Sequence, residues 1–175
     1  MEYNKALEIA EKTKAQLAPY CERIEIAGSI RRKKPDVGDI EIVAIPKPYD
    51  IGLFESGIVP VVNQWEKIKG ELPCKYTQRM LPEGIKLDLF FADKENWANI
   101  FAIRTGSAEY SHRRLAAEWV SQGYKSEGGY LYKNGEIEYF KYYGDNKKFE
   151  AGVNTYIELF DKSVFISGFC IKKEY

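Results

Sequence analysis

The sequence predicts an α+β fold, because stretches with helical spacing and stretches with strict two-residue alternation both occur along the chain. Residues 3–18 place apolar side chains at helical intervals, whereas residues 39–45 alternate apolar and polar side chains as a half-buried strand does. With 175 residues, of which 45% are hydrophobic and 14% aromatic, the chain can bury a core without disulfide bonds.

The first half of the chain is expected to form helix, strand, loop and strand. The helix at 3–18 ends at Pro19, and the alternating segment RIEIA at 23–27 follows as a strand. A polar, basic loop then leads to the strand at 39–45, which Pro46 closes. The stretch 49–74 gives mixed signals, with a helix suggested in its second half and glycines that interrupt it.

The second half begins with two strands, at 75–80 and 85–92, which the turn LPEG joins as an antiparallel pair. Residues 95–103 favour a helix. Ser107 is placed to cap a further helix that Gly123 ends, and GGYLYKNGEIEYF predicts a hairpin that turns at Asn134-Gly135.

Composition excludes several classes of protein. The 26 basic and 26 acidic residues cancel, so any contact with nucleic acid must be local rather than driven by an overall positive field. Cys21, Cys74 and Cys170 are odd in number and far apart, which argues against a disulfide framework and a cysteine zinc site. No segment approaches the roughly 18 apolar residues of a membrane span. We therefore expect a soluble, intracellular protein of the cytoplasm or nucleoid.

Carboxylates are the first candidate for chemistry. Side chains alternate along a strand, so Asp39 and Glu41 project to one face and the intervening isoleucines to the other. In KLDLFF, Lys86 and Asp88 share a face in the same way. If the two strands are neighbours, three carboxylates converge, and Lys86 either offsets their charge or forms a plain cross-strand ion pair.

Three crowded acids repel one another unless a cation neutralises them, and oxygen ligands favour magnesium or manganese. Two such ions, about 3.5–4 Å apart, can bind the attacking and leaving oxygens of a phosphoryl transfer. The alternative is that these acids simply face solvent on half-buried strands.

The loop before residue 39 favours the metal interpretation. Backbone N–H groups around Gly28 and Gly38, the Ser29 hydroxyl and the Arg32 guanidinium can cradle phosphates beside the acids. The alternative for this loop is a solvated basic turn.

Three segments carry a resemblance to a known family. GSIRRKKPDVGDIEIV resembles the signature of the polymerase beta nucleotidyltransferase superfamily, and KLDLFF resembles the strand with its third acid. RTGSAEYSHRRLAAEWVSQGYKSEGGYLYKNGE is similar to the segment of family X DNA polymerases in which palm meets thumb. The likeness covers residue 5 to about residue 160.

This resemblance implies a palm at residues 1–104, built as a mixed or antiparallel sheet with helices on one face. A small thumb-like α/β subdomain would follow at 105–175, as in the minimal two-domain viral members of family X. The lyase domain and helix-hairpin-helix fingers of larger members have no counterpart here, so sugar removal at abasic sites is not expected.

The resemblance also implies roles for individual residues. Asp39 and Glu41 would hold two Mg²⁺ or Mn²⁺ ions, and Asp88 would hold the catalytic ion and help to activate the primer 3′-hydroxyl. The nucleotide would lie against Gly28, Ser29, Arg32, Gly38, Thr105 and Gly106, of which Thr105 and Gly106 would approach the sugar. The template–primer minor groove would face Ser111, Arg113 and Arg114, although a solvated helix face is an equal alternative for the two arginines.

The expected activity is therefore a family X type, DNA-directed DNA polymerase that fills short gaps in repair. Its partners would be a nucleoside triphosphate and gapped or primed DNA, and we expect a monomer without a membrane partner. Glu41 in place of the usual aspartate, together with the neutral net charge, leaves two rival interpretations, and Arg104 in place of an aromatic residue leaves open whether ribonucleotides are refused. One rival interpretation is nucleotide transfer to a small molecule, RNA end or protein, and the other is a binding module without turnover. The lone His112 is assigned no role.

Overall fold

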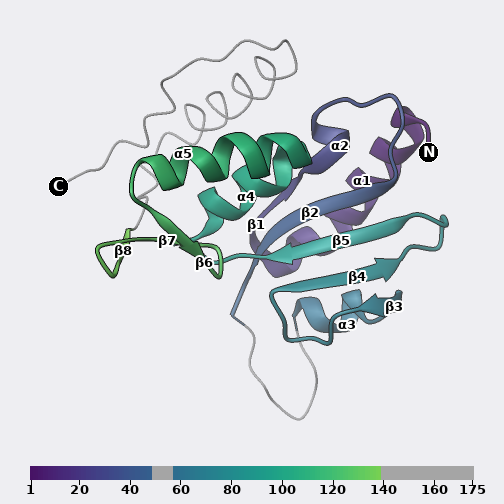
Figure 1. The fold of residues 1–175 in the computed structure, drawn as a ribbon. Coiled ribbons are helices and arrows are strands. Elements are labelled where there is room, and N and C mark those ends of the chain that lie inside the picture. Colours follow the sequence, from purple (N-terminus) through teal and green to yellow (C-terminus); the bar gives the residue numbers. More distant parts are fainter. Residues whose placement is uncertain (49–56, 139–175) are drawn as a thin grey trace. The chain divides into compact units, whose positions relative to one another are not determined.

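The computed structural model describes residues 1–48 and 57–138, and the chain divides into two compact units, Met1–Lys94 and Glu95–Tyr175 (Figure 1). Each unit is described by itself. The division falls ten residues before the boundary at 104/105 implied by the resemblance, so the helix at Trp97–Thr105 belongs to the second unit.

The first unit contains a five-stranded sheet in the order β1-β2-β5-β4-β3. Strands β2 and β5 are parallel, while every other neighbouring pair is antiparallel, so the sheet is mixed and the predicted α+β class is confirmed. The strands are β1 (Cys21–Ile26), β2 (Asp39–Pro46), β3 (Glu66–Lys69), β4 (Tyr76–Met80) and β5 (Lys86–Phe91). The helices are α1 (Tyr3–Leu17), η1 (Ala18–Tyr20), α2 (Gly28–Arg31) and α3 (Ile58–Val62).

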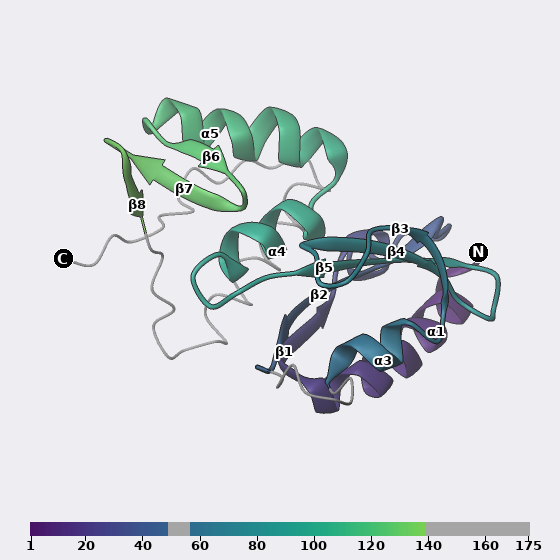
Figure 2. The same cartoon turned by 90° about the horizontal axis from the view of Figure 1, so that it is seen from below.

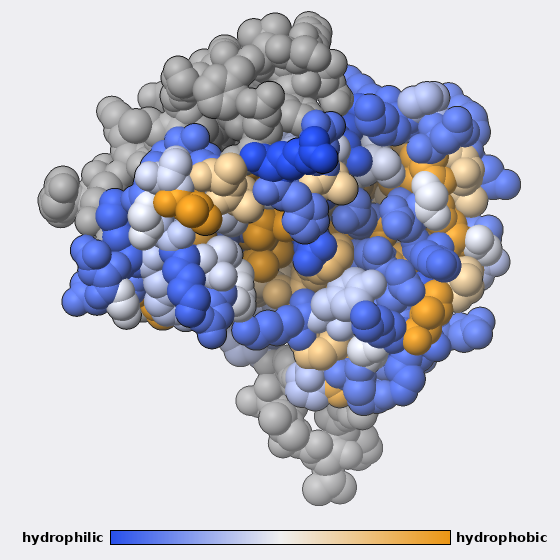
Figure 3. Space-filling model, viewed as in Figure 1, coloured by the Kyte–Doolittle hydropathy of each residue, from blue (hydrophilic) through white to orange (hydrophobic). Residues whose placement is uncertain are grey.

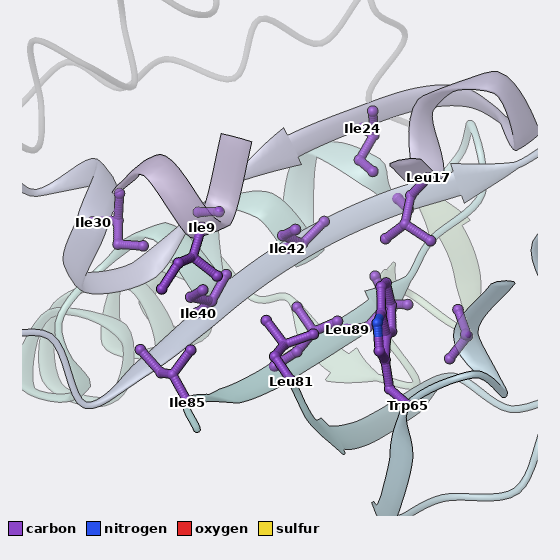
Figure 4. Close-up of a cluster of buried hydrophobic side chains, with 14 of the residues drawn as sticks. Ile9, Leu17, Ile24, Ile30, Ile40, Ile42, Trp65, Leu81, Ile85 and Leu89 are labelled. Carbon is purple, nitrogen blue, oxygen red and sulfur yellow. The ribbon is translucent and has the colours of Figure 1, made fainter. Parts of the chain in front are cut away.

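One face of this sheet carries the core. Helices α1 and α3 lie together on that face (Figure 2), and α1 buries Ile9 and Leu17 because its apolar residues recur every three to four positions. Their partners include Ile40 and Ile42 from β2 and Leu89 from β5, all with 0% exposure (Figure 4). Because this face is packed, the polar side chains of the same strands must project from the opposite face.

Two segments differ from the sequence-based expectation. The loop after β1 begins with the helical turn α2, after which Lys33 adopts a positive φ of 56°. The mixed stretch resolves into α3, which contains Pro60, and the exposed edge strand β3, where a helix had been suggested. Pairing with β4 supplies the hydrogen bonds of β3, and a single-sequence pattern does not contain that tertiary contact.

The second unit combines helices with a three-stranded sheet in the order β6-β7-β8. Its cap and its turn were both predicted: the Tyr110 N–H donates to Ser107 Oγ at 3.1 Å, and Asn134 and Gly135 have φ values of 54° and 85°. Trp119 and Leu131 lie in its core. The elements are α4 (Trp97–Thr105), η2 (Tyr110–Leu115, a π-helical turn), α5 (Ala116–Ser121), β6 (Lys125–Glu127), β7 (Tyr130–Lys133) and β8 (Glu136–Glu138).

Polar side chains predominate on the face of the first unit drawn in Figure 3, and apolar atoms form small areas between them. Within residues 1–48 and 57–138, no helix is both long and apolar enough to pass through a bilayer. The expected monomer and the expected compartment stay predictions.

Candidate active site

The candidate acids lie on two adjacent strands. Strands β2 and β5 pair in parallel register, with Glu41 opposite Asp88 and Asp39 opposite Lys86. Neighbouring strands are roughly 4.8 Å apart, so these four side chains form a compact group on the face away from the core. The two strands are therefore neighbours in the sheet. This adjacency was the condition for the three acids to lie close together.

Asp88 is held from the side of β4. The Tyr76 hydroxyl donates to Asp88 Oδ1 at 3.0 Å, and Gln78 Nε2 donates to the same oxygen at 2.7 Å. Gln78 lies directly opposite Asp88 in the antiparallel register of β4 and β5. Neither residue was predicted from the sequence, although the turn LPEG predicted that their strand pairs with the strand that carries Asp88.

Glu41 lies against Gly28, at the start of the candidate phosphate loop (residues 28–38). A Cβ added at Gly28 would come 1.8 Å from Glu41 Oε2, and Gly28 has a positive φ of 61°. The Ala27 N–H also donates to the Glu41 carbonyl oxygen at 2.8 Å, which ties this loop to β2. Gly28 therefore provides the space in which the longer side chain of Glu41 extends.

Asp39 is electrostatically coupled to its neighbours. Burial raises the pKa of Asp39, the nearby Asp88 carboxylate raises it further, and Lys86 and Arg32 act in the opposite direction. The two carboxylates are thus close enough to interact, and two cations from different segments partly offset their charge. Lys86 accordingly acts on Asp39, which it faces across the strand pair.

Across the described residues, no three His, Cys, Asp or Glu side chains approach closely enough to enclose one metal ion. Asp88 Oδ1 accepts hydrogen bonds from β4, while Glu41 extends toward Gly28. The donor set itself, three carboxylates on one polar face, is of the type that Mg²⁺ and Mn²⁺ bind.

The Ser29 hydroxyl is a notable polar group of the candidate phosphate loop. Ser29 Oγ is buried and makes no hydrogen bond within the described part of the chain, and such groups call for an explanation. A Cβ at Gly38 would meet nothing within 4 Å, so packing inside the chain does not demand a glycine there. Arg32 follows α2, and its charge lowers the pKa of Asp39. The guanidinium therefore lies near the acids.

The candidates in the second unit are arranged mainly by its own packing. Thr105 is buried at the end of α4, and a Cβ at Gly106 would lie 2.1 Å from Cδ1 of Tyr110. The Ser111 hydroxyl donates to the Ile103 carbonyl oxygen at 2.7 Å. Gly106 therefore allows the close approach of η2 to the preceding turn, and the hydroxyl of Ser111 is engaged inside the unit.

The remaining candidates lie on η2. Arg113 has an 80% exposed side chain whose Nη1 is 3.9 Å from Glu109 Oε1, and His112 is also exposed. The side chain of Arg114 lies outside the described part of the structure. Exposure of Arg113 suits both contact with DNA and a solvated helix face, so this prediction stays open.

The raised pKa of Asp39 predicts a pH-dependent stability. A carboxyl group with a folded pKa above its unfolded value holds its proton more tightly when folded, so the protein loses stability as pH rises from about 4 through the folded value. Asp39→Asn should remove this loss and be more stable than the wild type at pH 7. The gain should be only about a few tenths of a kcal/mol, because solvent screens the charge of the half-exposed group. Urea unfolding of both proteins in EDTA at pH 3 and pH 7 checks this. If the free energies of unfolding of the variant and the wild type differ equally at both pH values, the prediction is wrong.

Two comparisons with known proteins found no match. The chain matches no protein-family model, and a comparison with curated proteins also found none.

Proposed function

We propose that this chain is a nucleotidyltransferase that extends a DNA primer in the manner of family X DNA polymerases, filling short gaps. The observation that carries the proposal is the parallel register of β2 and β5, with Asp39, Glu41 and Asp88 on one polar face. The buried, unsatisfied hydroxyl of Ser29 beside that face supports it, because a phosphate oxygen would accept its hydrogen bond.

The reaction would be an attack of the primer 3′-hydroxyl oxygen on the α-phosphorus of the triphosphate, with release of pyrophosphate and of the hydroxyl proton. Bound divalent cations would supply charge neutralisation on the attacking and leaving oxygens. Asp39 and Glu41 would hold both ions and Asp88 one. Ser29 and Arg32 would orient the β and γ phosphates.

Primer extension tests the proposal. The full chain is incubated with a labelled primer on a gapped duplex, each deoxynucleotide and Mg²⁺ or Mn²⁺, and the expected product is a primer lengthened by the templated nucleotide. Glu11→Gln, which changes an exposed acid on α1, serves as the matched control for purification and folding. Absence of extension under both metals would overturn the polymerase assignment.

A second candidate is transfer of a nucleotide to a small molecule, an RNA end or a protein side chain. The observation that favours it is Glu41, whose extra methylene carries the carboxylate to Gly28 instead of keeping it over β2. Incubation with α-labelled nucleoside triphosphates and separate acceptors distinguishes the two candidates. Label on a non-DNA acceptor, without primer extension, would replace the first proposal by the second.

A further inference from the structure

We propose that Tyr76 and Gln78 are positioning residues that hold Asp88 so that one of its oxygens stays available to a divalent cation. The inference rests on the proposed function, since it treats Asp88 as a metal ligand. Both residues belong to β4, which carries no acid of its own.

Both hydrogen bonds end on the same atom. Tyr76 and Gln78 donate to Oδ1 of Asp88 at 3.0 Å and 2.7 Å, and each carboxylate oxygen accepts about two hydrogen bonds. Oδ1 is therefore satisfied by two neutral donors, and Oδ2 remains the oxygen for a cation. Neutral donors orient the carboxylate without competing with a cation for its charge.

The tyrosine is itself fixed by its neighbours. Its ring stacks on Phe90 with centroids 4.9 Å apart and an interplanar angle of 23°, and Lys69 Nζ lies over the ring at 5.8 Å from its centroid. Phe90 is only 6% exposed, so the stack has a rigid base. Packing thus restricts the rotation of the Tyr76 side chain whose hydroxyl donates to Asp88.

The glutamine is placed by strand register. Gln78 and Asp88 face each other across the antiparallel pair of β4 and β5, where opposed side chains are nearest. Only the NH₂ group of an amide can donate to a carboxylate, so the orientation of this amide follows from its partner. Strand pairing and aromatic packing therefore fix the two donors independently of one another.

Hydrogen bonds of this kind matter because a free aspartate samples several rotamers, and the charge of Asp39 repels Asp88. Carboxylates that bind metals are usually hydrogen-bonded in turn, and loss of such a partner weakens metal binding by about 10- to 100-fold. The two donors on β4 hold Asp88 against that repulsion before an ion arrives.

The test is a titration of the full chain with Mn²⁺. The electron paramagnetic resonance signal of the unbound ion measures how much Mn²⁺ has bound. Tyr76→Phe keeps the ring and its stack but removes the hydroxyl, and Gln78→Met keeps the volume but removes the donor. Each variant should weaken Mn²⁺ binding about tenfold, while its unfolding temperature in EDTA stays at the wild-type value. Tyr20→Phe, in the turn η1 before β1, is the matched control and should bind as the wild type does.

The possible outcomes separate the inference from the function on which it rests. If the wild type binds Mn²⁺ and Asp88→Asn does not, but both β4 variants bind normally or more tightly, the positioning role is overturned and the proposed function stands. If the wild type binds no Mn²⁺, or Asp88→Asn binds it equally well, the metal role of Asp88 fails and both proposals fall together.

Discussion

Asp88→Asn is expected to lower primer extension by about a thousandfold or more, because phosphoryl transfer depends chiefly on positioning and charge stabilisation. The substitution keeps the shape of the side chain, and Tyr76 can still donate to the amide oxygen, so β5 and its hydrogen bonds should persist. The neutral amide, however, cannot offset the charge of divalent cations. Single-turnover extension assays at saturating nucleotide measure the loss.

The matched controls for this variant are chosen to separate charge from folding. Glu11→Gln removes a carboxylate from an exposed position on α1 in the same unit and should keep full activity. The unfolding temperature of Asp88→Asn in EDTA should equal or exceed that of the wild type, because one source of repulsion for Asp39 is gone. Extension by Asp88→Asn within a few fold of the wild type would eliminate Asp88 as a metal ligand.

Gly28→Ala should lower activity about a hundredfold while it costs only about 1–2 kcal/mol of stability, the penalty for a Cβ at a positive φ. The new Cβ would come 1.8 Å from Glu41 Oε2, which is the movable end of a side chain, so Glu41 gives way. The fold therefore survives, but an acid proposed to hold both ions is displaced. Kinetics of extension and urea unfolding measure the two effects separately.

A double variant tests whether Glu41 mediates the effect of Gly28→Ala. Glu41→Asp withdraws the carboxylate by one methylene and makes room for the added Cβ, so Gly28→Ala should cost much less activity in that background than in the wild type. Residues in direct contact show such non-additive behaviour. Additive losses would mean that Gly28 acts through backbone conformation alone, without Glu41.

Local patterns were enough to predict much of the fold. The alternation in DIEIVAI and KLDLFF fixes which side chains share a face, since the period of a strand is two. The same reasoning predicted the Ser107 cap and the Asn134-Gly135 turn, because each depends on residues within a few positions of one another. The edge strand β3 was missed because its structure comes from pairing with β4.

The same distinction between local patterns and contacts of distant segments applies to the candidate site. Sequence alone determined that Asp39 and Glu41 share a face and that a polar loop with glycines precedes them, because both are properties of contiguous residues. Only the tertiary structure decided that Asp88 faces Glu41 in register, that Tyr76 and Gln78 hold it, and that Glu41 extends to Gly28. These contacts join segments distant in the chain, and their geometry depends on strand register and on the space that packing leaves, which no local pattern encodes.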